Sequence, residues 1–105
     1  MRCTVMSVYI LLSKLTTEGR KTIKERPGRI KEVAVEFESL GVKVLEQYAT
    51  LGPYDFLTVI EAPDNETVSE LSVDLCSRGT IEIMTLAAIP VDSYVSALRS
   101  TKKAK

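Results

Sequence analysis

The residues best suited to chemistry gather around one predicted turn in the middle of the chain. The stretch from Tyr48 to Phe56 reads Tyr-Ala-Thr-Leu-Gly-Pro-Tyr-Asp-Phe, so tyrosines and an aspartate flank a Gly-Pro turn. Phenol hydroxyls donate hydrogen bonds, and a carboxylate accepts them or acts as a weak base. Tyr48, Tyr54 and Asp55 are therefore candidate ligand-binding residues in the wall of a pocket between a sheet and its helices.

Each of these three side chains also has a common structural role. Aspartate beside a turn often accepts hydrogen bonds from nearby backbone N–H groups, and tyrosine at a strand end packs its ring while its hydroxyl stays in water. If Asp55 is structural, Asp55→Asn lowers stability. If Asp55 is functional, the same change abolishes ligand binding and leaves the melting temperature unchanged. The sequence leaves both interpretations open.

Tyr9 and Ser13 are two further candidate ligand-binding residues. Both stand at odd positions of a predicted strand, so their side chains lie on the same face of it. If this face closes a barrel, their hydroxyls line a pocket. Alternatively, the hydroxyls are hydrogen-bonded within a contact between subunits, and the sequence does not separate the two.

Basic residues also gather around the first predicted helix and the start of the second. Guanidinium groups near a helix N-terminus can hold a carboxylate or a phosphate. Glutamates interrupt this run, however, and mixed charges are typical of a solvated face. We favour the solvated interpretation for the side chains concerned, which are Arg20, Lys21, Lys24, Arg26 and Arg29.

The most restrictive feature of the composition is the absence of histidine. Ser–His and Cys–His nucleophile pairs, imidazole metal ligands and the commonest general base are therefore excluded, also between identical subunits. Cys3 and Cys76 stand far apart, without the spacing of a zinc site or a disulfide framework, and we expect both to be buried as small apolar residues. We predict no metal, no cofactor and no assigned catalytic residue.

Charge and hydropathy limit the partners that the chain can have. Lys and Arg together number 14, as do Asp and Glu, so the basic surplus that neutralises nucleic-acid phosphates is missing. No apolar run approaches the roughly 20 residues needed to cross a bilayer, and the N-terminal residues do not resemble a signal peptide. We therefore expect a cytoplasmic protein that binds neither nucleic acid nor membrane.

Hydrophobic periodicity divides the 105 residues into strands and helices of one domain. Alternating apolar residues predict strands over residues 3–14, 42–49, 55–62 and 80–89. Helical spacing, with hydroxyl or acidic caps and terminal glycines, predicts helices over residues 17–25, 27–41, 65–79 and 91–98. We expect one domain over residues 1–98 and a flexible basic tail over residues 99–105.

These elements follow the order β-α-β-β-α-β, the split βαβ arrangement of ferredoxin-like folds. We predict an α+β fold with a four-stranded antiparallel sheet and helices on one face. The sheet's other face should then be polar in a monomer, but both faces of the strands carry bulky apolar residues. This pattern predicts that the second face is buried against another subunit, with a symmetric dimer as the simplest case.

Several segments, in the same order along the chain, resemble the GYD-domain family over about residues 9–94. The segments are Tyr9 to Thr16, Glu18-Gly19, Lys24 to Arg29, Tyr48 to Phe56 and Glu61 to Asp64. Pro53 separates Gly52 from Tyr54 and Asp55, so the motif here is Gly-x-Tyr-Asp. The resemblance implies a ferredoxin-like subunit that pairs into a dimeric α/β barrel, and it implies no known activity.

We therefore predict a homo-oligomeric small-ligand-binding domain without established catalysis, whose partners are copies of itself and an unidentified small molecule. One alternative is a cofactor-free isomerase or monooxygenase of the dimeric α/β-barrel type. It would act on a small aromatic or acidic substrate, with Asp55 as the base and a tyrosine orienting the substrate. A second alternative is a module for assembly or interaction only.

Overall fold

The computed structural model describes residues 6–103, which form four strands and four helices. The strands are β1 (Ser7–Leu15), β2 (Lys43–Ala49), β3 (Phe56–Ala62) and β4 (Ile81–Ala88). The helices are α1 (Thr17–Glu25), α2 (Arg29–Ser39), α3 (Asn65–Cys76) and α4 (Val91–Lys103). All eight elements were expected from the sequence, and most of their ends differ from the predicted ends by only a residue or two.

The strands form one antiparallel sheet in the order β2-β3-β1-β4. The central strand β1 pairs with β3 from Ser7 opposite Ala62 to Ser13 opposite Phe56, and with β4 along its other edge. This is the predicted ferredoxin-like α+β fold, with β2 and β3 as antiparallel neighbours. The register also fixes the faces, because residues directly opposite each other in an antiparallel pair point to the same side.

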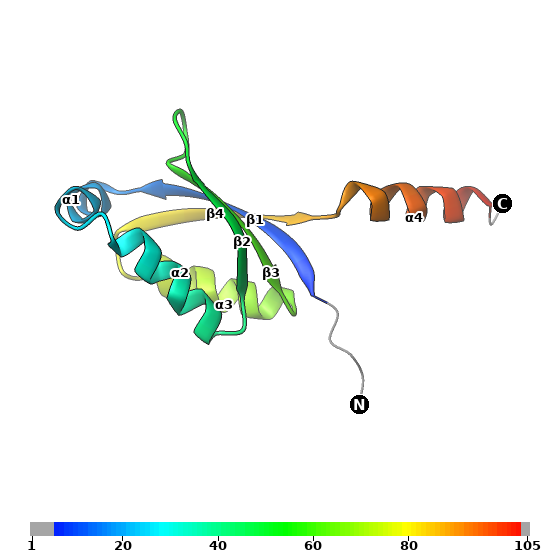
Figure 1. The fold of residues 1–105 in the computed structure, drawn as a ribbon, viewed down its shortest axis with the longest axis horizontal. Helices are drawn as coiled ribbons and strands as arrows, with labels where there is room; N and C mark the ends of the chain where they lie inside the picture. The colour runs from blue at the N-terminus through cyan, green and yellow to red at the C-terminus, as the bar shows by residue number, and fades with distance from the viewer. Residues whose placement is uncertain (1–5, 104–105) are drawn as a thin grey trace.

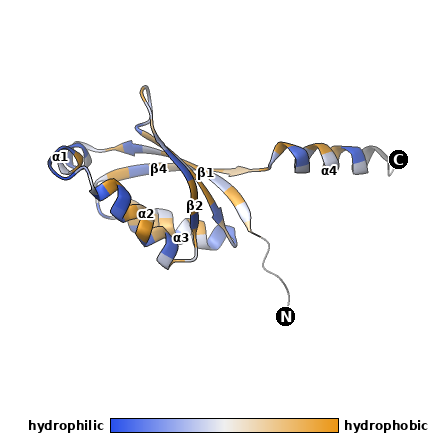
Figure 2. Cartoon of the chain, in the orientation of Figure 1, coloured by the Kyte–Doolittle hydropathy of each residue, from blue (hydrophilic) through white to orange (hydrophobic). Residues whose placement is uncertain are grey.

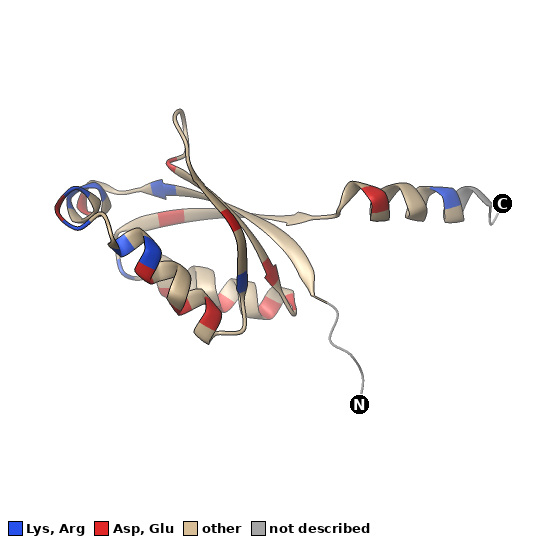
Figure 3. Ribbon diagram, in the orientation of Figure 1, with Lys and Arg blue, Asp and Glu red and all other residues tan. Residues whose placement is uncertain are grey.

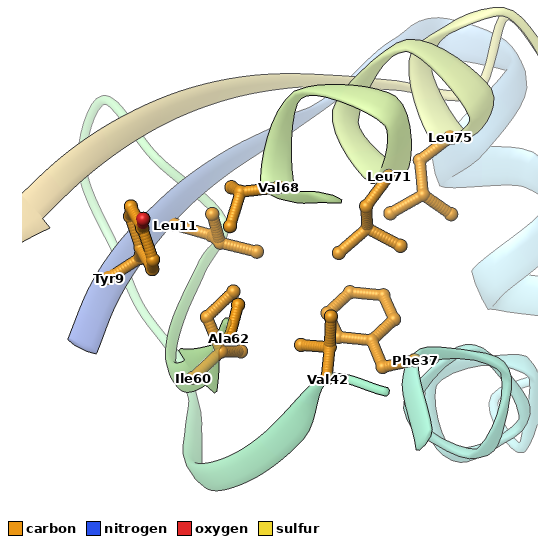
Figure 4. Packing of buried hydrophobic residues seen from close by; sticks show 9 residues of the cluster. All are labelled: Tyr9, Leu11, Phe37, Val42, Ile60, Ala62, Val68, Leu71 and Leu75. Carbon is orange, nitrogen blue, oxygen red and sulfur yellow. The ribbon is translucent and has the colours of Figure 1, made fainter. Parts of the chain in front are cut away.

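Helices α2 and α3 cover one face of the sheet, and no other described element packs on the opposite face (Figure 1). We call the first the covered face and the second the open face. Apolar side chains from the sheet, from α2 and α3 and from the loop after α2 meet on the covered face and form the core (Figure 4). Its members are Tyr9, Leu11, Phe37, Val42, Ile60, Ala62, Val68, Leu71 and Leu75.

Local signals in the sequence set the helix ends. The Thr16 hydroxyl caps α1 by accepting a hydrogen bond from the Gly19 N–H at 3.1 Å. Asp64 caps α3, where its Oδ1 accepts from the hydroxyl and the backbone N–H of Thr67 at 2.7 and 2.8 Å. These two hydrogen bonds hold the pKa of Asp64 below its ordinary value of 3.8. After α3 the chain turns at Gly79, whose φ of +80° is one that glycine adopts without strain.

The first strand and the last helix have other bounds than the sequence predicted. The first strand was predicted from residue 3, but residues 3–5 and Cys3 with them lie outside the described range, and β1 begins at Ser7. Helix α4 continues to Lys103, past the predicted end at residue 98, because no glycine or proline follows to stop it. Residues 99–103 therefore continue the helix where a tail was expected.

Two further expectations concerned the burial of the cysteines and the crossing of a membrane. Cys76 is half-buried, which corrects the expectation of a fully buried thiol. In the described part of the chain, no helix has the length and apolar character needed to cross a bilayer.

Candidate functional site

The five residues that the sequence singled out lie in three different places, and the first is the core. Tyr9 is only 4% exposed, and its hydroxyl donates a hydrogen bond to Oδ1 of Asn65 at the start of α3. The ring packs on the covered face, not on a face that closes a barrel. Tyr9 therefore joins β1 to α3, and it also lines a second pocket together with Val68 and Thr85.

Asp55 holds the end of β1 against the start of β3. Its Oδ2 accepts a hydrogen bond from the Leu15 N–H at 2.8 Å, and its own N–H donates to the Ser13 carbonyl at 2.7 Å. Its carbonyl in turn accepts from the Thr50 N–H at 2.8 Å. These contacts are those of the structural interpretation, because they extend the β1–β3 pairing past its last residue and close the loop after β2.

Tyr48 and Tyr54 lie at the open face. Tyr48 stands opposite Leu57, on the side of the sheet away from α2 and α3, and is 53% exposed. The Tyr54 hydroxyl points to the Met84 sulfur, 3.5 Å away, on β4. The two tyrosines therefore belong with the open face and share no pocket with Tyr9.

Ser13 lines a cavity of about 270 Å³ between the covered face and helices α1 and α2. Most of the wall is apolar, with Leu11, Phe37 and Leu75 among its members. Of the five predicted residues, Ser13 is the one that lies in the wall of this cavity. Its position supports a pocket between sheet and helices, although the other four candidates do not share it.

A buried hydroxyl on the neighbouring strand accompanies Ser13 in this cavity. Thr58 also lines it, and the two residues are 5% and 4% exposed. Among the described residues neither hydroxyl is hydrogen-bonded to another protein group, yet neither is sealed off from the cavity. Because both hydroxyls are accessible from the cavity, it offers a ligand two positions for hydrogen bonds.

Two arginines also line the cavity, Arg29 from α2 and Arg78 from the turn after α3. A carboxylate oxygen of Glu36 lies 3.5 Å from Arg29 and the other lies 2.9 Å from Arg78. Asp74 contacts Arg78 as well, at 2.9 Å. Hydrogen bonding to Glu36, and then to Asp74, raises the pKa of Arg78 despite partial desolvation. The glutamate therefore bridges α2 to the segment after α3 beside the cavity.

The remaining charged residues of α1 and α2 are mixed in sign, as the ribbon in Figure 3 shows. Arg26, for example, pairs with Glu32 at 3.2 Å, and both side chains are half exposed or more. Such pairs contribute little to stability. The solvated interpretation given to these basic residues agrees with their contacts, except that Arg29 also reaches the cavity.

The open face carries the largest group of uncovered apolar side chains on the sheet. The register places three rows across β3, β1 and β4 on this side, with Tyr48 at the edge. The apolar residues are Val8, Ile10, Leu12, Tyr48, Leu57, Val59, Met84 and Leu86. Met84 and Leu86 are 50% and 42% exposed. Apolar surface of this extent on one face usually marks an interaction site.

Helix α4 leaves the end of β4 and projects away from the rest of the subunit (Figure 1). It makes no substantial contact with another described element. Hydrophobic residues nevertheless recur along it at helical spacing, with hydrophilic residues between them (Figure 2). Val91, Tyr94 and Leu98 are 73%, 51% and 54% exposed, so α4 presents an apolar stripe to its surroundings.

The sequence did not reveal that α4 is free. The helical spacing of Val91, Tyr94, Val95 and Leu98 was visible, but spacing does not show whether the subunit's own core uses it. The sequence predicted a pocket between sheet and helices, but Tyr48, Tyr54 and Asp55, the residues expected in its wall, do not line the cavity under α1 and α2. In the described residues no group of three or more cysteine or acidic side chains is placed to hold a metal ion.

Comparison with known proteins gives one family and one characterised relative. The model of the GYD domain matches residues 9–98. A protein of Thermus thermophilus is 48% identical over 95 residues, which cover 90% of this chain and 100% of the relative. That relative is named glutamine synthetase and cystathionine beta-lyase binding protein. No solved structure gives a significant match.

Proposed function

Because this chain belongs to the GYD domain family, we propose that it is a protein-binding module that works as a homo-oligomer and binds a second protein. The observation that carries the proposal is the apolar surface that the fold leaves uncovered, on the open face and along α4. The name of the Thermus relative supports a protein as the second partner. The proposal includes no reaction.

In this proposal the open face binds the open face of a second copy. Two-fold symmetry brings the same patch of both subunits together, so the patch has to be self-complementary. The apolar centre of the open face is compatible with that condition, because it brings no like charges together. Residues of opposite charge stand next to each other at its margin, Lys14 opposite Glu82 and Lys43 opposite Glu61, so a two-fold partner would meet both signs.

In the same proposal α4 binds the second protein. An amphipathic helix that is already formed and free needs only a hydrophobic groove on its partner, which it enters with its apolar stripe. Helix α4 extends beyond the end of the sheet, so it lies apart from the open face that this proposal assigns to the second copy (Figure 1). Tyr94 is suited to anchor such a contact, since tyrosine is enriched among residues that dominate binding energy.

The first experiment measures the oligomeric state. Ile10→Glu places a charge at the centre of the open face, and Val73→Glu makes the same kind of change at an exposed position of α3. Light scattering should give an oligomer for the parent chain and for Val73→Glu, and a monomer for Ile10→Glu. A monomeric parent at micromolar concentration would refute self-association.

The second experiment measures binding to purified glutamine synthetase and cystathionine beta-lyase of Thermus thermophilus, with the 48% identical relative as the positive control. The parent chain should bind at least one of the two enzymes. Tyr94→Ser combined with Leu98→Ser should abolish that binding and leave the oligomeric state unchanged. Binding that survives this double change would show that α4 is not the contact surface.

The cavity favours a second candidate function, the binding of a small molecule by each subunit. Its wall includes Ser13 and Thr58, two buried polar residues whose hydroxyls are not sealed off from the cavity. The alternative of a cofactor-free enzyme with Asp55 as base has weaker support, because Asp55 does not line the cavity and its carboxylate is bonded to Leu15. Thermal denaturation with and without small amphiphilic acids tests this second function through a rise in melting temperature on binding.

A further inference from the structure

We propose that the cavity under α1 and α2 binds a small monocarboxylic acid with an apolar body, an inference that rests on the second candidate function above. The cavity volume of about 270 Å³ corresponds to roughly nine water molecules, since water occupies about 30 Å³ in the liquid. That space suits one aromatic ring or a short branched chain with its polar group.

The charged side chains in the wall favour a ligand that carries a carboxylate. The charged side chains that line the cavity are Arg29 and Arg78, and no acidic side chain joins them in the wall. Three carboxylates outside the lining already contact these arginines: Glu36 contacts both, Glu32 contacts Arg29 at 3.2 Å, and Asp74 contacts Arg78 at 2.9 Å. A guanidinium group has five N–H donors, so each arginine keeps donors for one more carboxylate after these contacts.

The rest of the wall favours a ligand with an apolar body and determines how that ligand is oriented. Leu11, Phe37 and Leu75 belong to the buried core, and their side chains form the inner wall. The side chains of Arg29 and Arg78 are 27% and 35% exposed, so they lie nearer the opening. The acid therefore enters with its apolar body first and leaves its carboxylate at the arginines.

The hydroxyls of Ser13 and Thr58 add a polar position on the strands. They come from adjacent strands, β1 and β3, and are both more than nine-tenths buried. A ligand with a hydroxyl or carbonyl group on its body satisfies them, and a purely apolar body leaves them with water. Hydroxylated or keto-substituted acids should therefore bind more tightly than the parent acid.

Calorimetric titration of the full chain with phenylacetate and with its neutral analogue phenylacetamide tests the ligand class. We expect the acid to bind about tenfold more tightly than the amide, because charge-assisted hydrogen bonds are about twice as strong as neutral ones. Arg78→Gln should remove this preference, and Arg29→Gln is the second variant if Arg78→Gln alters the circular dichroism spectrum.

Variants of the hydroxyls test the location. Thr58→Val keeps the shape and removes the hydroxyl, and a keto acid, phenylpyruvate, should lose several-fold in affinity for it while phenylacetate loses less. Ser13→Ala is a second variant, which removes the other hydroxyl of the wall. The matched control is Thr85→Val, which removes an exposed strand hydroxyl outside the cavity and should change neither titration.

The possible failures are distinguishable. If acid and amide bind equally and Thr58→Val weakens both, the cavity binds small molecules but the carboxylate class is wrong. If neither probe binds at millimolar concentration, the ligand class and the small-molecule function are both overturned. If all variants bind as the parent does, the probes bind elsewhere and the cavity is not the site. Binding of the protein partner is measured separately and does not depend on these results.

Discussion

The carboxylate of Asp55 accepts a hydrogen bond from the backbone N–H of Leu15, with 2.8 Å between Oδ2 and the nitrogen. The two residues are 40 positions apart in the sequence, at the end of β1 and before the start of β3. The contact holds the end of β1 against the chain before β3. It also leaves the residue most suited to base chemistry outside the cavity.

The first prediction concerns this contact. Asp55→Ala should lower the free energy of unfolding by about 1–3 kcal/mol, because the Leu15 N–H loses its partner in a partly buried position. Asp55→Asn should cost less, since an amide oxygen can still accept the bond. Urea denaturation measures both, with Glu38→Ala as control, an exposed acidic residue of α2. Equal stability of Asp55→Ala and the parent would refute the structural role.

The second prediction concerns the close packing of α1 on the start of β4. A Cβ atom at Gly19 would overlap the Thr80 carbonyl oxygen, which cannot move without breaking its hydrogen bond from the Thr16 N–H. Gly19→Ala should therefore destabilise the chain by about 1–3 kcal/mol or more, despite the better helix propensity of alanine.

Gly28 provides the matched control for this change. A Cβ atom there meets nothing within 4 Å, and its φ of −64° suits any residue. Gly28→Ala should stay within about 0.5 kcal/mol of the parent in the same urea titration. If both variants behaved alike, the contact between Gly19 and Thr80 would not limit the fold.

The third prediction concerns pH. Hydrogen bonds from Thr67 hold the pKa of Asp64 below 3.8 in the folded chain, so the folded state favours the charged carboxylate more than the unfolded state does. This contribution is present above about pH 4, the unfolded value, and is lost as the pH falls through the folded value. The melting temperature of Asp64→Ala should thus lie below that of the parent at pH 7.

The difference between the two melting temperatures should shrink as the pH falls below 4. Asp92→Ala, which removes an acidic residue from the first turn of the free helix α4, is the control for a general effect of lost charge. A difference that stays constant from pH 7 to pH 2.5 would contradict a contribution from the charged cap.

The fourth prediction concerns α4. Removing residues 91–105 should change the free energy of unfolding by less than about 0.5 kcal/mol, because α4 makes no substantial contact with the rest of the described subunit. The measurement is best made with Ile10→Glu in both chains, so that self-association does not contribute. A large loss of stability would show that α4 packs on its own subunit in solution.

The sequence alone determined the order and most of the ends of the elements. Period-2 alternation defined the strands, and Thr16, Asp64 and Gly79 marked the helix ends, because caps and turns act on neighbours within a few residues. The register of β1 also followed in part, since alternation divides its residues into two sets. The family resemblance was confirmed by the match over residues 9–98.

Only the tertiary structure decided which of the two sets faces the helices. Tyr9 and Ser13 share one side of β1, and Ile10 and Leu12 share the other, but both sides are apolar enough to form a core. The packing of α2 and α3 settles the choice, and with it the surface that is left open. The candidate residues lie in different places because contacts between distant segments, such as that of Asp55 with Leu15, position them, and the sequence does not show such contacts. The free apolar stripe of α4 was likewise not predictable, because periodicity gives a helix its faces but not its neighbours.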